Sequence, residues 1–201
     1  MKVFLTSLYV ILAIMQQAVA QSSWKSPAYK AESYRKVIVM AKISDDLARR
    51  QLEDASVKLL NEKGITAIPA YSNITETDLA SEDAFIQKAD ALQADAVIVF
   101  NITGTGTEYK NKPSVDAYVG VPVRIGIFRA SIGGNVPLAG GTKVVTVVNA
   151  TAGFYNRSSK DLLWSTQLSG KLKKDTDKLA AAFAKATVNA LLKDGMFLQN
   201  K

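Results

Sequence analysis

The chain has no cysteine and no histidine among its 201 residues. Without cysteine there is no disulfide, no thiolate nucleophile and no thiolate zinc site. Without histidine, imidazole metal ligands, Ser-His-Asp triads and the usual proton shuttle near neutral pH are excluded within one chain. Only carboxylates, lysines, tyrosines and hydroxyls remain for chemistry, and we expect no catalytic residue, no metal and no cofactor.

The first twenty residues have the pattern of a cleavable secretory signal peptide. Lys2 is the only charged residue there, residues 3–15 are almost all apolar, and Ala18-Val19-Ala20 forms an A-x-A site. A membrane span needs roughly 17–25 apolar residues, more than this run offers. We therefore expect cleavage near Ala20 and a periplasmic or secreted product. Because Gln21 rather than a cysteine follows the site, no lipid anchor is expected.

The remaining chain is long enough for one domain with a substantial core. Residues 21–35 are polar and show no period, so they are predicted to be a lead-in without regular structure, followed by a single domain over residues 36–201. The formal net charge of +7 is thinly spread. Export argues against nucleic acid as a partner, and the charge favours a solvated basic surface with at most weak attraction to anionic surfaces. Oligomeric state is left open.

In the first half, apolar runs rich in β-branched residues alternate with amphipathic patterns. The predicted strands are residues 36–42, 65–70 and 96–102, and the predicted helices begin at the caps Ser44 and Ser81. Strands separated by helices in this way are typical of parallel crossover units. Pro69 favours an edge position for the second strand.

The first predicted helix has its apolar stripe at Ala48, Leu52, Ala55 and Leu59. Glu53 and Glu62 are expected on its polar face.

The second half has a different pattern. Residues 103–112 are expected to be a Gly/Thr loop, and residues 142–154 and 162–172 are expected to form a hairpin. A last helix is predicted to be capped by Asp175 or Thr176 and to end before Gly195. Whether residues 115–141 form strands or a mobile loop stays open. The predicted fold class is α/β: a parallel β-α-β-α-β half, then an antiparallel hairpin and a C-terminal helix, in a two- or three-layer sandwich.

One candidate site follows from this topology. Ligands of open parallel sheets tend to bind beyond the carboxyl ends of the strands. The residues expected there are small or hydroxyl-bearing and could admit a ligand or a partner's backbone: Ser44, Asn101, Thr103, Gly104, Thr105 and Gly106. The alternative is that this loop simply turns the chain into its second half.

Most acidic residues are explained by predicted helix starts, where a carboxylate favours the positive helix end. A glycoside hydrolase needs two carboxylates facing each other across a cleft, within roughly 10 Å. The alternative function is therefore a carboxylate-based hydrolase acting on cell-wall or extracellular glycan, with its acids drawn from Asp95, Glu108, Asp116 and Asp161.

Several segments resemble a group of small, uncharacterised bacterial envelope proteins, many of them lipoproteins. These segments are residues 23–29, 36–71, 94–109, 161–170 and 179–197. More distantly, the arrangement is similar to the amino-terminal domain of the Tol-system translocation protein and to curli-secretion lipoproteins. The resemblance implies an α/β envelope domain used for association, with no active site to carry over. We therefore expect an exported accessory or binding protein whose partner is another envelope protein.

Overall fold

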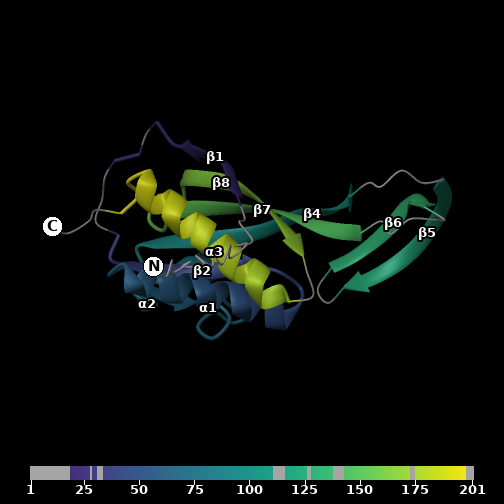
Figure 1. Cartoon of the computed structure of the whole chain (residues 1–201). Coiled ribbons are helices and arrows are strands. Elements are labelled where there is room, and N and C mark those ends of the chain that lie inside the picture. The colour runs from purple at the N-terminus through teal and green to yellow at the C-terminus, as the bar shows by residue number, and fades with distance from the viewer. Residues whose placement is uncertain are drawn as a thin grey trace, which may run out of the picture.

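The computed structural model describes residues 19–27, 29–30, 34–110, 116–125, 128–137, 143–172 and 175–197. The main sheet has six strands in the order β1-β8-β7-β4-β2-β3, and a second sheet has two (Figure 1). The main strands are β1 (Val19–Lys25), β2 (Lys36–Lys42), β3 (Thr66–Pro69), β4 (Ala96–Lys110), β7 (Lys143–Asn156) and β8 (Leu162–Leu172). The second sheet pairs β5 (Asp116–Ile125) with β6 (Phe128–Pro137), and the helices are α1 (Asp46–Glu62), α2 (Glu82–Ala91) and α3 (Thr176–Lys193).

The parallel half is confirmed. β2 pairs in parallel with β3 on one side and with β4 on the other. Val37, Ile38 and Val39 are fully buried, as expected for a central strand covered on both faces. β3 is the edge strand and ends at Pro69, whose missing N–H fits that place.

Two details of α1 differ from the sequence prediction. The helix is capped by Asp45, whose side chain accepts a hydrogen bond from the backbone N–H of Ala48, and not by Ser44. A carboxylate there also complements the positive helix end. Glu53, predicted on the polar face, is fully buried. The inward stripe is therefore rotated from the expected one and consists of Ala48, Leu52, Glu53, Ser56 and Leu60.

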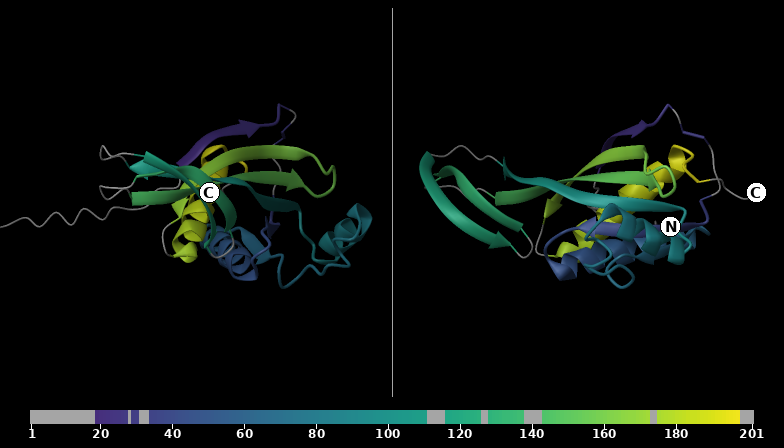
Figure 2. Two further views of the ribbon diagram at one scale, coloured as in Figure 1. Left: turned by 90° about the vertical axis from the view of Figure 1, so that its right-hand side faces the viewer. Right: turned by 180° about the vertical axis from the view of Figure 1, so that it is seen from behind.

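Helices lie on both faces of the sheet. One core cluster joins α1 and α3 to the inward residues of the sheet, with Phe100, Phe154 and Trp164 at its centre. A smaller cluster joins α2, through Ala89, to the opposite face of β2 and β4, at Ile38 and Val97. α2 therefore covers only the parallel part of the sheet (Figure 2).

The antiparallel hairpin and the last helix are confirmed. β7 pairs with β4 and with β8 in antiparallel register. α3 follows the cap residue Asp175. The chain leaves it through Gly195 at φ +67°, a left-handed conformation that favours glycine.

Two segments predicted to be irregular are strands. Residues 103–110 continue β4 and pair with β7, so the expected loop over residues 103–112 is wrong for that part. Residues 19–25 form β1, which pairs with β8. The lead-in is also tied to the end of α3: Lys25 Nζ donates to the Asp194 carbonyl at 2.8 Å, and the Tyr29 hydroxyl donates to the Met196 carbonyl at 3.1 Å.

Residues 1–18, and hence most of the predicted signal peptide, lie outside the described residues. Parts of the open stretch over residues 115–141 do as well, but its described parts form β5 and β6. Among the described helices, none is both long and apolar enough to cross a membrane.

Candidate functional site

The predicted site residues are not in a loop but on and beside β4. Asn101 pairs with Lys42 at the end of β2. Ser44 is exposed just beyond that end, before α1. The other predicted residues follow Asn101 along β4: Thr103, Gly104, Thr105 and Gly106. The carboxyl end of β2 and the second half of β4 thus meet, but as a strand surface rather than a loop.

The strand register divides these residues between the two faces of the sheet. Directly opposed residues in antiparallel strands share a face, and neighbours along a strand alternate. Thr105 pairs with the buried Val148, so it belongs to the face covered by α3. Asn101, Gly104 and Gly106 belong to the other face. Thr103 occupies a register shift between Ile102 and Gly104, where the strand changes its alternation.

The other face of the antiparallel half is uncovered in the part of the chain that the structure describes. We call it the open face. It consists of Asn101, Gly104, Gly106 and Glu108 of β4, Val145, Val147, Asn149 and Thr151 of β7, and Ser165, Gln167, Ser169 and Lys171 of β8. None of these residues is buried, whereas their neighbours on the α3 side are core residues such as Ala150, Ala152 and Leu168. Seen from behind, β4 lies in front with its second half clear of α1 and α2 (Figure 2).

The two glycines on the open face have no role in packing this chain. A Cβ atom built at Gly104 or Gly106 would meet no heavy atom within 4 Å. Neither has a positive φ, so both adopt an ordinary extended conformation. Glycine in a strand interior costs about 0.5–1 kcal/mol relative to alanine and often marks a place where another molecule comes close. By contrast, a Cβ at Gly170, on the covered face, would lie 2.5 Å from Leu179 Cδ1.

Polar uncharged groups dominate the rest of the open face. Its hydroxyl and amide side chains can donate and accept hydrogen bonds. Glu108 and Lys171, on β4 and β8, form an ion pair across it. Trp24 of β1 pairs with Ser165 and is 48% exposed. The surface offers hydrogen bonds and one exposed aromatic ring, which suits recognition better than chemistry.

Glu53 is the buried charged group that sequence reasoning missed. Its Oε1 accepts from the backbone N–H of Ala41 at 2.9 Å, and its Oε2 accepts from that of Tyr71 at 2.8 Å. One carboxylate thereby joins the ends of β2 and β3 to α1. The position of Glu53 in the helix is the sequence signal that indicates its burial. Glu53 is seven residues before the buried Leu60, and the two residues lie on the same face of the helix.

Burial raises the pKa of the Glu53 carboxyl, because a charged group loses hydration in the core. The hydrogen bonds from Tyr71 and Ala41 and the positive charge of Arg49 lower that pKa without cancelling the effect of burial. Both carboxylate oxygens accept hydrogen bonds from backbone N–H groups, which need an acceptor within the folded chain. Glu53 is therefore placed to hold strand ends together, not to meet a substrate.

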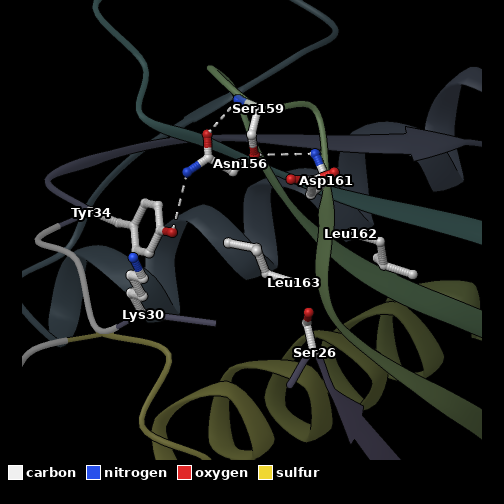
Figure 3. A pocket seen from close by; sticks show the side chains of 8 residues that line it. All are labelled: Ser26, Lys30, Tyr34, Asn156, Ser159, Asp161, Leu162 and Leu163. Carbon is white, nitrogen blue, oxygen red and sulfur yellow. Dashed lines mark hydrogen bonds between the residues drawn. The ribbon is translucent and has the colours of Figure 1, made fainter. Parts of the chain in front are cut away.

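A cavity of about 310 Å³ lies at the turn between β7 and β8 (Figure 3). Its charged lining residues are Lys30 and Asp161. Much of its polar wall is used by the turn: Asn156 Oδ1 accepts from the backbone N–H groups of Ser158 at 2.7 Å and Ser159 at 3.0 Å. The remaining lining residues are Ser26, Tyr34, Leu162 and Leu163. No pair of carboxylates lines this cavity.

Of the four acids of the hydrolase alternative, only Asp95 and Asp161 lie at the same end of the main sheet. Asp95 and Glu108 are thirteen residues apart along an extended chain, which separates them by about 40 Å. Asp95 Oδ2 accepts from the backbone N–H groups of Arg35 at 2.7 Å and Lys36 at 2.9 Å. Asp161 lies at the Asp95 end of the sheet, and Glu108 lies at the other. Asp116 begins β5, and nothing in this arrangement supports hydrolysis.

Within the described residues, no three His, Cys, Asp or Glu side chains gather so that they could hold a metal ion.

No family model and no curated protein matches the sequence. Solved structures that partly resemble this chain include a variant PelC dodecamer from Paraburkholderia phytofirmans, at 16% identity and a TM-score of 0.48, over 92% of this chain and 100% of that chain. Lipoprotein GNA1162 from Neisseria meningitidis is 17% identical, with a TM-score of 0.40 over 79% and 98% of the two chains. A DUF330 protein from Xanthomonas campestris is 10% identical, with a TM-score of 0.36 over 85% and 87%.

At these identities and scores the similarities assign the chain to no family. A likeness to the Tol-system translocation protein is not shown, and that part of the resemblance stays a prediction.

Proposed function

We propose that this chain is an exported, non-catalytic accessory protein of the cell envelope that binds a partner protein through the open face of its sheet. The proposal depends on one observation: Gly104 and Gly106 lie on an uncovered face and serve no packing or backbone need of the chain itself. A partner that approaches the sheet closely would explain why Gly104 and Gly106 lack side chains.

The two glycines leave a gap in the row of side chains that β4 presents on the open face. On the open face, Asn101 precedes the two glycines along β4 and Glu108 follows them. Two positions without side chains therefore lie between two positions with polar side chains. On β7, Asn149 is directly opposite Gly104, and Val147 is opposite Gly106. A partner backbone or a flat side chain fits such a gap, where neighbouring amide side chains can form hydrogen bonds with its polar groups.

The chemistry of the face favours binding over catalysis. Its one described carboxylate, Glu108, is 49% exposed and paired with Lys171. No second carboxylate of known placement lies within reach of it, as a glycosidase would require. The export signal predicted from the sequence supports a location in the periplasm or outside the cell, and an envelope protein as the partner.

The test fills the gap with side chains at positions that pack against no other part of the chain. Gly104→Val and Gly106→Val together add two β-branched side chains that suit a strand, and the added Cβ atoms meet no heavy atom within 4 Å. The tagged, exported chain is crosslinked in intact cell envelopes and its partners are identified by mass spectrometry. We expect the wild-type chain to capture a specific envelope protein and the double variant to lose at least nine-tenths of it.

A control variant adds a valine side chain elsewhere on the surface. Ala181→Val lies on the exposed side of α3, away from the open face, and should capture the partner as well as the wild type. Thermal unfolding of all three proteins establishes that the fold is intact. If the double variant folds and captures the partner like the wild type, the open face is not the binding surface.

A further inference from the structure

The cavity of about 310 Å³ at the turn between β7 and β8 is formed by two segments that lie far apart in the sequence. Ser26, Lys30 and Tyr34 come from the connection between β1 and β2, whereas Asn156 and Asp161 come from β7 and the turn that follows it. We call it the turn cavity (Figure 3). A concave site where a few polar groups converge beside apolar side chains is the usual form of a small-molecule site.

Both sides of the turn cavity are held in place by the fold. The backbone N–H of Ser26 donates to the Leu163 carbonyl at 2.9 Å. The ring of Tyr34 is buried and packs edge-to-face against Phe154, with the ring centroids 5.0 Å apart. Asn156 fixes the turn by accepting hydrogen bonds from two backbone N–H groups. The cavity is therefore formed before any ligand enters, which reduces the entropy that binding costs.

Lys30 and Asp161 bring opposite charges to opposite sides of the turn cavity (Figure 3). No ion pair joins them, and neither forms an ion pair with another residue in the described part of the chain. At the same turn another charged side chain does have a partner, since Lys160 Nζ lies 2.7 Å from Glu82 Oε1. Two opposite charges that line one cavity without meeting leave a place between them for a molecule that carries both signs.

The size of the turn cavity suits a free amino acid. One water takes about 30 Å³ of liquid, so 310 Å³ gives room for about ten non-hydrogen atoms. The ammonium nitrogen and the carboxylate carbon of an α-amino acid are about 2.5 Å apart. Charge-assisted hydrogen bonds of about 2.8 Å at each end bring the span to about 8 Å. A sphere of 310 Å³ is also about 8 Å wide.

We propose that the turn cavity binds a free α-amino acid with an aliphatic side chain. The Lys30 ammonium donates to the carboxylate of the ligand, and the Asp161 carboxylate accepts from its ammonium group. Leu162 and Leu163, which also line the cavity, contact the aliphatic side chain. Because Lys30 and Asp161 are exposed, we expect a modest Kd on the order of 100 μM. This site is separate from the open face, so the proposed function does not depend on it.

The test is isothermal titration calorimetry of the purified chain with L-leucine, L-valine, L-isoleucine and L-methionine. We expect at least one of them to bind. Isocaproate and isoamylamine are leucine without its ammonium group and without its carboxylate, respectively. Each should bind about 10-fold more weakly than leucine, or not at all, because each leaves one charge of the cavity without its partner.

Single substitutions assign the two charges. Lys30→Gln and Asp161→Asn should each weaken amino-acid binding about 10-fold. Lys58→Gln and Glu62→Gln are the matched controls, because both side chains are exposed on α1 away from the cavity, and they should leave binding unchanged. Lys30→Glu combined with Asp161→Lys exchanges the charges and should restore binding relative to either change alone, since an amino acid can enter in the reverse orientation.

Thermal unfolding verifies that each variant is folded. Failure of all four amino acids to bind the wild-type chain would overturn the proposal. Equal binding of leucine and its two singly charged analogues would do the same, because recognition would then be apolar only. A third contrary result is amino-acid binding that Lys30→Gln and Asp161→Asn leave unchanged. None of these results would affect the capture of an envelope protein by the open face.

Discussion

Replacing Glu53 by glutamine tests how the parallel half of the sheet is held together. The carboxylate accepts one backbone N–H from Ala41 and another from Tyr71. A glutamine of the same shape keeps one acceptor oxygen but presents its NH₂ group to the other N–H. A buried donor left without an acceptor costs about 1–3 kcal/mol. We expect Glu53→Gln to lower the free energy of unfolding by about 2 kcal/mol near neutral pH.

The pH dependence gives a second, independent readout. Burial raises the folded-state pKa of Glu53 above its ordinary value of 4.5. The folded protein therefore holds this proton at pH values where the unfolded chain has released it. Stability contributed by Glu53 is complete below the unfolded-state pKa and falls as pH rises through the folded-state pKa. The difference in unfolding free energy between the wild type and Glu53→Gln should therefore decrease as the pH rises from the unfolded-state pKa to the folded-state pKa. Above the folded-state pKa this difference should be constant.

The assay is chemical denaturation followed by circular dichroism, from pH 3.5 to pH 8. At this chain length, 2 kcal/mol corresponds to a decrease in melting temperature of about 4–8 °C. Glu62→Gln serves as the control, because Glu62 is exposed near the end of the same helix and its replacement should change stability by less than 0.5 kcal/mol. Equal effects of the two substitutions, or a gap that widens with pH, would refute this account of Glu53.

Two further predictions concern the packing of the antiparallel half. Trp164→Phe removes the indole N–H that donates to Asp194 at 2.7 Å; it should cost about 1–3 kcal/mol in denaturant titrations, and a loss near zero would show that water replaces this bond. Gly170→Ala places a Cβ 2.5 Å from Leu179 Cδ1 and 2.9 Å from Phe183 Cε1, and should destabilise by about 1–3 kcal/mol. Gly104→Ala should instead leave stability unchanged or raise it by up to about 1 kcal/mol, and a similar loss at both glycines would contradict the assignment of the two faces.

The parallel half was predictable because its signals are local and agree with one another. β2 is a continuous apolar run, and α2 begins at the cap Ser81, whose hydroxyl accepts from the backbone N–H of Ala84. The β7–β8 hairpin was predictable for a similar reason, since residues 156–161 supply turn residues between two apolar patterns.

The second half of β4 was not predictable from its residues alone. Glycine has low strand propensity and is common in loops, so the sequence around Gly104 and Gly106 predicts the end of a strand. Pairing with β7 overrides that preference by satisfying the backbone over the whole length of β4. β1 was missed in the same way, because its polar residues show no alternation and its strand exists only through pairing with β8.

The placement of the candidate residues was predictable only in part. Asn101 lies beside Lys42 at the end of β2, as expected, but Gly104 and Gly106 lie further along β4, and Thr105 lies on the covered face. No sequence pattern could show that, because the register shift after Ile102 changes which residues face the helices. The role of these residues in binding stays a prediction.

The central claim is that a partner binds the open face of the sheet. The most direct measurement is photocrosslinking in intact envelopes, with a photoreactive amino acid at Asn149 in one variant and at Ala181 in another. Asn149 is exposed opposite Gly104, and Ala181 is exposed on α3 behind the sheet. The account predicts a discrete crosslinked envelope protein from position 149 and none from position 181. Crosslinks from position 181 alone, or from neither, would contradict it.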